Sequence, residues 1–176
     1  VKPQFYDLLF PINFWLDINT NFGNRIQDGN EQEQNAFTLE AYKIFNLNDR
    51  NSFFLRLTGA SLSSDNYLDN ELYRFGGINS IRGFEENSLV ANLFGVINTE
   101  YRYRLSNTIY IHSVIDAAYF ENDITNTKNK LFRFGVGLGL LTKAGLFRLN
   151  YSSGKTENIP FKLSDSKIHV SLTASF

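Results

Sequence analysis

The chain contains no cysteine, which excludes disulfide bonds and metal sites built from thiolates. This absence also fits an oxidising compartment, where stray thiols are a liability. No run of about 18 apolar residues is present, so the sequence offers no candidate for a transmembrane helix. The net charge of −1 gives no electrostatic support for a nucleic-acid partner. The sequence has no internal repeat, and 176 residues suit a single domain.

What the sequence has instead is alternation of apolar and polar residues with a period of two, the pattern of a β-strand with two different faces. Residues 12–22 place Phe14, Leu16 and Ile18 on one face and polar residues on most of the other. A run of eleven residues is longer than the usual globular strand and is the length that a tilted strand needs to cross a bilayer. The predicted strands are residues 12–22, 36–47, 52–63, 93–105, 109–120, 131–142, 146–152 and 167–176.

The connections between these strands alternate in length. We expect tight turns at 48–51, 106–107 and 143–145, and long polar connections at 23–35, 64–92, 121–130 and 153–166. A soluble sandwich would also alternate apolar and polar residues, but short turns on one side and long loops on the other are typical of outer-membrane barrels. The sequence therefore predicts an all-β, antiparallel transmembrane β-barrel of outer-membrane type, in contact with the lipid bilayer of a bacterial outer membrane. The aromatic residues expected at its two membrane interfaces are Tyr101, Tyr103 and Phe176 on the short-turn side and Phe22, Tyr119 and Tyr151 on the other.

The connection at 64–92 is unusually long, rich in glycine and too apolar for a disordered segment. It contains Arg82, which stands between an isoleucine and a glycine. If the loop folded outward, Arg82 would be one more solvated charge. If it folded into the barrel, the guanidinium would need a carboxylate partner, because a buried unpaired charge is costly. By strand parity, Glu100 and Asp116 both point into the lumen on the next two strands, and either could form a bidentate pair.

Three glycines, Gly135, Gly137 and Gly139, share the polar face of one predicted strand. Glycine within a strand marks the close approach of another group. They could form a smooth strip of wall against which a loop lies, or they could allow the barrel to curve.

The sequence does not support catalysis or metal binding. His112 and Asp116 lie four residues apart on one strand, about 13 Å, which is too far for a hydrolase triad. No cluster of histidine and acidic residues has metal-ligand spacing. We interpret His112 and His169 as solvated side chains of the lumen.

The segment from Phe75 to Phe84, Phe-Gly-Gly-Ile-Asn-Ser-Ile-Arg-Gly-Phe, resembles the Val/Ile-Arg-Gly-Phe/Tyr motif in the sixth extracellular loop of the BamA/TamA/FhaC superfamily. This group, also called bacterial surface antigens, comprises outer-membrane insertases and transporters. The segment at 98–103 resembles the strand that follows this loop, and Val114-Ile-Asp116-Ala-Ala resembles the next strand. The resemblance covers about residues 36–176 and includes the glycines at 135–139 and the terminal Phe176.

The resemblance implies that this chain is the C-terminal half of a sixteen-stranded barrel. The N-terminal half-barrel and periplasmic POTRA domains would then precede Val1, in keeping with a chain that begins without methionine or a signal peptide. It also implies that Ile81, Arg82, Gly83 and Phe84 latch the loop inside the lumen, with Arg82 paired to Asp116 and Glu100 nearby. Phe176 would serve as a terminal assembly signal.

The predicted function is to assist the insertion or translocation of unfolded or secreted client polypeptides, without a cofactor and without catalysis by this chain. Two alternatives remain. The chain could anchor an N-terminal patatin-like lipase, because the longer sixth loop usual in the essential insertase is absent. It could also be a passive structural barrel that closes with eight strands.

Overall fold

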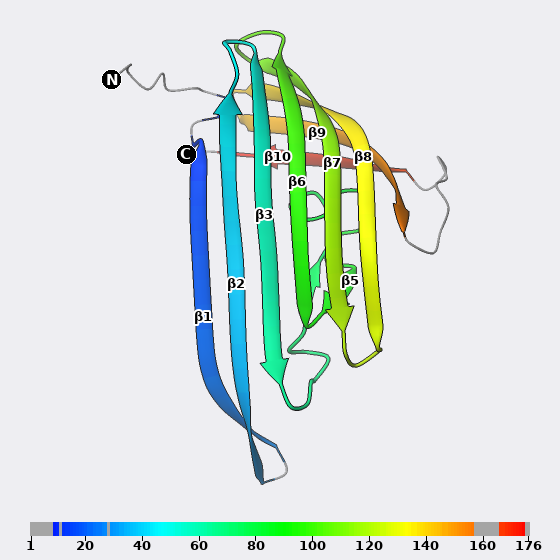
Figure 1. The fold of residues 1–176 in the computed structure, drawn as a ribbon. Helices are drawn as coiled ribbons and strands as arrows, with labels where there is room; N and C mark the ends of the chain where they lie inside the picture. The colour runs from blue at the N-terminus through cyan, green and yellow to red at the C-terminus, as the bar shows by residue number, and fades with distance from the viewer. Residues whose placement is uncertain (1–8, 11, 28, 157–165, 175–176) are drawn as a thin grey trace.

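The computed structural model describes residues 9–10, 12–27, 29–156 and 166–174. Within them the chain forms one antiparallel sheet of eight strands and a separate pair of short strands (Figure 1). Each of the eight predicted strands is present in the large sheet. Its strands are β1 (Phe14–Gln27), β2 (Asn30–Asn46), β3 (Asn51–Ser64), β6 (Leu93–Arg104), β7 (Ile109–Asn122), β8 (Thr127–Thr142), β9 (Gly145–Thr156) and β10 (Lys167–Thr173).

The prediction of long connections at 23–35 and 121–130 is wrong. β1 and β2 stay paired as far as Gln27 and Asn30, and only four residues, 123–126, separate β7 from β8. The prediction relied on alternation of apolar residues, and the continuation of β1 and β2 is polar on both faces except at Ile26. Backbone pairing does not need that alternation, so the hairpin extends beyond the part of the strand that the pattern identified.

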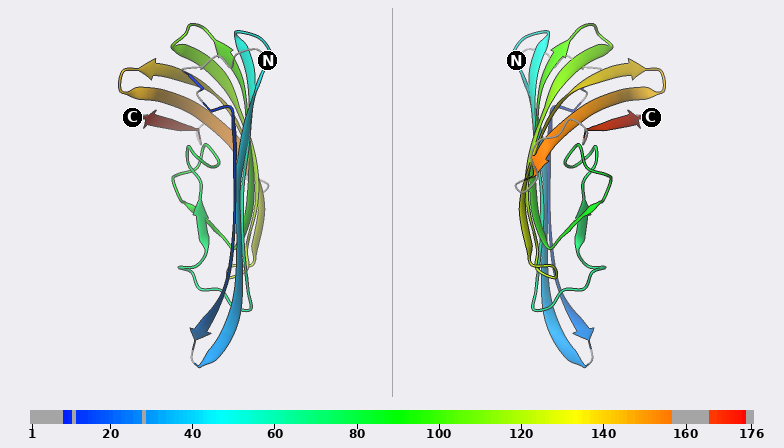
Figure 2. Two further views of the ribbon diagram at one scale, coloured as in Figure 1. Left: turned by 90° about the vertical axis from the view of Figure 1, so that its left-hand side faces the viewer. Right: turned by 90° about the vertical axis from the view of Figure 1, so that its right-hand side faces the viewer.

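The connection between β3 and β6 differs from the others because it contains its own secondary structure. β4 (Tyr73–Phe75) pairs with β5 (Leu89–Ala91) in a small antiparallel ladder. The predicted long connection at 64–92 therefore contains a short hairpin of its own. Both side views show the segment folded back over the concave side of the large sheet (Figure 2).

The large sheet is an open trough. β1 and β10 are its two edges, and among the described residues they pair only with β2 and β9 respectively. The views in Figure 2 show the strands curling around the loop without meeting on the far side. A self-contained eight-stranded barrel would require β1 and β10 to pair, and the arrangement of the described strands does not provide this.

The convex face of the trough is apolar and exposed, as the alternation predicts. Residues such as Phe14 (56% exposed), Ile115 (58%) and Val136 (63%) point outward without a protein neighbour to cover them. A soluble monomer rarely exposes an apolar surface of this extent, whereas a barrel in a bilayer requires one. No helix in the described ranges is long and apolar enough to cross a membrane.

Candidate functional site

The candidate site lies where the loop between β3 and β6 meets the concave wall of the trough. One part of the contact between loop and wall is an apolar core. Phe75 from β4 stacks on Phe94 of β6, with ring centroids 4.5 Å apart, and meets Phe120 of β7 edge-on at 5.5 Å. Ile81, near the tip of the loop, is completely buried. The remaining members of this loop–wall core are Ala60, Ala91, Val96, Ala118 and Leu131, with Tyr73, Phe84 and Leu89 packed against it.

A polar lumen was predicted from the sequence, and this apolar core was not. A signal for it was present, because residues 93–97 and 117–120 carry apolar side chains on both faces of the strand. A strand that is apolar on both faces is covered on both. Here the loop covers the inner face, and the outer face is the one directed to the bilayer.

Beside the apolar core, Arg82 contacts side chains of the adjacent wall strands β6 and β7 and is only 3% exposed. Its Nε donates to Asp116 Oδ2 at 2.8 Å and its second terminal nitrogen donates to Asp116 Oδ1 at 2.5 Å. The backbone N–H of Arg82 also donates to Asp116 Oδ2, at 3.1 Å. The first terminal nitrogen donates to Glu100 Oε1. The guanidinium therefore makes a bidentate contact with β7 and a single contact with β6.

Burial by itself would lower the pKa of Arg82, because it disfavours the charged form. The hydrogen bonds to Asp116 and the negative charge of Glu100 outweigh it and raise the pKa above its ordinary value. The guanidinium therefore remains charged inside the trough.

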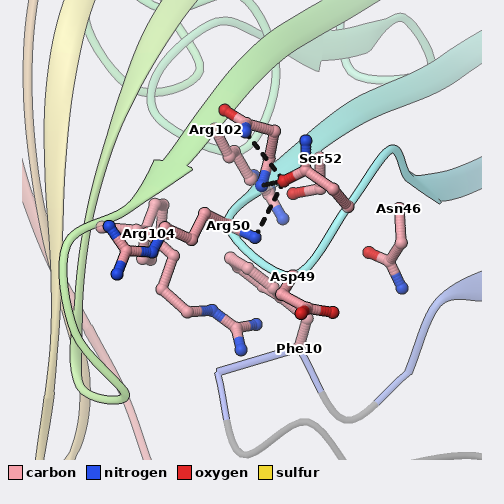
Figure 3. Close-up of a pocket in the computed structure, with 10 residues that line it drawn as sticks. Phe10, Asn46, Asp49, Arg50, Ser52, Arg102 and Arg104 are labelled. Atoms are coloured by element: carbon pink, nitrogen blue, oxygen red, sulfur yellow. Dashed lines mark hydrogen bonds between the residues drawn. The ribbon is translucent and has the colours of Figure 1, made fainter.

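Glu100 is shared between two arginines. Its second oxygen accepts a hydrogen bond from Arg102 Nε at 2.7 Å. The Arg102 guanidinium lies 4.2 Å from the ring centroid of Phe54 and 4.4 Å from that of Phe10. Arg102 also lines a small pocket at the short-turn end of the wall, where it lies beside Ser52 (Figure 3). The pair of Glu100 and Arg102 thus belongs to the wall, whereas Arg82 is brought to it by the loop.

The loop tip is also held by the last strand. The N–H of Gly83 donates to His169 Nε2 of β10 at 2.8 Å, and Glu85 accepts from Lys167 Nζ at 3.1 Å. Gly83 has a φ of +91°, which favours glycine, and a Cβ there would come within 3.2 Å of both Arg133 and Ser152. Glycine therefore lets the chain turn sharply and approach the wall closely. The ring of Phe84, next in the motif, lies 4.0 Å from the Arg133 guanidinium.

The base of the loop is fixed to the far end of the β1–β2 hairpin. Arg25 donates to Glu71 Oε2 at 2.5 Å, and Gln34 donates to the same oxygen at 3.1 Å. Burial opposes ionisation of Glu71, but these hydrogen bonds lower its pKa below the ordinary value. The polar extension of β1 and β2, predicted from the sequence to be a loop, thus provides the anchor for the loop base.

The sequence can also be compared with known families. The sequence profile of the Omp85 superfamily domain matches residues 12–176. The chain belongs to the Omp85 superfamily. This confirms the resemblance seen in the sequence and supports the interpretation of the open sheet as part of a larger barrel. Omp85 proteins are outer-membrane β-barrels of the membrane-protein assembly family. A search among curated proteins found no match.

Two predictions about the Omp85 wall need correction. The groups nearest to a Cβ at Gly135, Gly137 and Gly139 belong to the wall itself and not to the loop. The β9 backbone at Tyr151 and Ser152 passes Gly135, and the ring of Tyr110 covers Gly139. Gly137 makes room for His112 and for Asn150, which are hydrogen-bonded to each other at 2.7 Å. The three glycines therefore allow close packing within the wall.

The interpretation of His112 as solvated is also wrong, and His169 is only partly exposed. His112 is 5% exposed and bonded to Asn150, and His169 accepts from the loop. Strand parity correctly placed both in the lumen, but side chains and the loop fill that part of the lumen. Phe176 lies outside the described residues. Within the parts of the chain that the structure describes, no three His, Asp or Glu side chains form a group that could hold a metal ion.

Phe75→Ala tests whether the loop–wall core stabilises loop docking. Removing a buried phenylalanine costs about 3–5 kcal/mol, and here the loss falls on the docked state of the loop. We expect faster tryptic cleavage after Arg74, measured by mass spectrometry of the folded protein in detergent. Phe53→Ala is the matched control, because Phe53 lies on the convex face at 36% exposure. Equal cleavage rates in the two variants would contradict the prediction.

Proposed function

We propose that this chain forms the C-terminal part of a sixteen-stranded Omp85 barrel that assists the insertion or translocation of client polypeptides at the bacterial outer membrane. In this proposal the N-terminal half-barrel and POTRA domains belong to the same protein. Ile81, Arg82, Gly83 and Phe84 act as a latch that keeps the loop inside the barrel. Asp116 is the main partner of the latch and Glu100 is the second.

The observation that carries the proposal is that the loop tip is hydrogen-bonded to three strands. Arg82 is bonded to β6 and β7, and the next residue, Gly83, is bonded to the edge strand β10. β10 has free backbone groups along one side in the described part of the chain, and such an edge can pair with an added strand. A loop that contacts this edge can hold it in place or release it when a client strand pairs there.

The passive eight-stranded barrel is disfavoured, because β1 and β10 lie apart as edges of the described sheet. The lipase-anchor alternative uses the same kind of barrel and differs only in what precedes it. Its active site would lie outside this chain.

The test is reconstitution of the full-length protein in liposomes. The probe client is a small outer-membrane barrel protein, unfolded in urea, whose folding is followed by its shifted gel mobility without heating. A second probe, an unfolded secreted polypeptide, is followed by protection from added protease. We expect the protein to accelerate one of the two processes relative to protein-free liposomes. Acceleration of neither would overturn the proposal, and release of fatty acid from the liposomes would favour the lipase anchor.

His169→Ala tests the link between loop and edge strand. The substitution removes one hydrogen bond to a buried N–H, with an expected cost of about 1–3 kcal/mol, and leaves the Arg82 contacts intact. We expect faster amide hydrogen exchange in residues 167–173, measured by mass spectrometry. His169→Gln is the matched variant, because its side-chain oxygen can still accept from Gly83, and it should exchange more slowly than His169→Ala. Unchanged exchange in His169→Ala would show that the contact does not hold β10.

A further inference from the structure

The convex face contains a hollow where two glycines stand opposite each other. Gly59 of β3 and Gly95 of β6 are direct cross-strand partners. Both point outward, because their neighbours on the same face, Leu57 and Ile97, are exposed. A Cβ at Gly95 would meet no atom within 4 Å, and one at Gly59 would meet only backbone atoms of the neighbouring strand. The floor of the hollow is therefore bare backbone.

Apolar side chains surround this floor and turn it into a groove. Its volume is about 500 Å³, within the range of about 300–1,000 Å³ that is usual for small-molecule sites. Ala117 of β7 adds a third small residue to this floor. It lies diagonally opposite Gly95, because Gly95 pairs with Tyr119 and Ala117 is two residues from Tyr119 along β7. We call this the glycine groove. Its side-chain walls are Leu39, Leu57, Ile97, Tyr119 and Phe132, with Lys130 at one end.

The end of the groove nearer the turn between β7 and β8 is polar. Tyr119 pairs with Lys130 across β7 and β8, and its hydroxyl donates to Glu121 at 2.5 Å. Lys128, on the same face of β8 as Lys130, forms an ion pair with Glu121 at 2.7 Å. No carboxylate of the described residues forms an ion pair with Lys130. An exposed, unneutralised ammonium thus stands at the mouth of an apolar groove, at the level where an aromatic interface residue was predicted.

We propose that the glycine groove binds one acyl chain of a membrane lipid whose anionic phosphate headgroup contacts Lys130. The chain lies over Gly59, Gly95 and Ala117, and the phosphate lies at the interface. A lipid is the occupant because the groove opens on the face that the exposed apolar strands direct to the bilayer. Its polar end also has the charge that a phosphate requires. This site is separate from the loop and does not depend on the proposed client activity.

Shape and charge, more than hydrophobicity, would select this lipid. Bulk lipid tails are as apolar as the groove, so burial from water adds little. The bare backbone allows an acyl chain to pack closer to the wall than it can beside larger side chains. The phosphate–ammonium contact at the interface then favours anionic over zwitterionic headgroups. The selection should therefore weaken when either part is removed.

The test is native mass spectrometry of the full-length folded protein in detergent with an equal mixture of phosphatidylglycerol and phosphatidylcholine. We expect the wild type to retain one phosphatidylglycerol more strongly than any phosphatidylcholine. Gly95→Leu fills the groove without meeting a protein atom at its Cβ, and it should abolish the retained lipid. Lys130→Gln should lower the preference for phosphatidylglycerol about fivefold.

Two controls separate the groove from general lipid contact. Thr20→Leu adds the same side chain on the exposed convex face of β1, away from the groove. Lys128→Gln removes a lysine from the same strand that is already paired with Glu121. Both should leave the retained lipid unchanged. If Gly95→Leu fails to fold, judged by gel mobility without heating, Gly95→Val and Lys130→Gln still test the site. Equal retention in the groove variants and the controls would overturn the proposal.

Discussion

Arg82→Ala should release the loop from the wall while leaving the sheet folded. Removing one partner of a buried ion pair costs about 3–5 kcal/mol, which corresponds to a change of two or more orders of magnitude in the docking equilibrium. The loss falls on docking because each of the two carboxylates keeps a basic neighbour in the wall. Glu100 remains bonded to Arg102, and Asp116 remains opposite Arg133, its buried cross-strand neighbour. In the liposome assay the released loop should reduce the acceleration of the client strongly.

Loop release can be measured with a single cysteine, since the chain has none of its own. Ser80→Cys is suitable, because the Ser80 hydroxyl is buried and has no hydrogen-bond partner among the described residues. Maleimide labelling should be slow in the docked loop and much faster with Arg82→Ala. Arg74→Ala is the matched control, because Arg74 is an exposed arginine on the same loop, and this variant should label slowly. If the Arg82→Ala variant folds, labels slowly at Ser80→Cys and retains full activity, the latch is refuted.

Arg82→Lys refines the same experiment. A lysine keeps the positive charge but cannot form the bidentate contact with Asp116 while also reaching Glu100. Labelling at an intermediate rate would show that the planar geometry of arginine contributes to docking beyond its charge.

The strands and the two wall carboxylates could be predicted because they depend on a local rule. In a strand, alternate residues face the same side, so Glu100 and Asp116 were placed in the lumen from parity alone. The identity of the strongest partner depended on the resemblance to the family, since parity allowed both. The apolar core around Phe75 and Phe94 was missed because alternation was read as apolar outside and polar inside. That reading fails where a loop covers the inner face.

The contact between Gly83 and His169 could not be predicted from sequence, because it joins residues 86 positions apart and depends on how the sheet curls. The extended β1–β2 hairpin was missed for a different reason. The extended parts of its two strands are polar on both faces except at Ile26, and backbone pairing leaves no periodic signal in such a segment. The base of the loop is attached there through Arg25 and Glu71, so that part of the anchor was not foreseen either.

Asp116→Asn and Glu100→Gln should affect different properties, although both remove a carboxylate that Arg82 touches. Asp116 accepts three hydrogen bonds from Arg82, including one from its backbone. Its replacement should free the loop and raise Ser80→Cys labelling nearly as much as Arg82→Ala does.

Glu100 accepts one hydrogen bond from Arg82 and one from Arg102. Removing its carboxylate therefore weakens one contact of the loop and one contact within the wall. Glu100→Gln should leave most of the docking intact, because the bidentate contact with Asp116 remains. It should lower the temperature at which the folded band disappears in unheated gels, because Arg102 loses its carboxylate while buried at 5% exposure. Faster labelling in Glu100→Gln than in Asp116→Asn would reverse the assignment and make Glu100 the main partner. The comparison needs no assumption about the client, because both measurements report on the barrel itself.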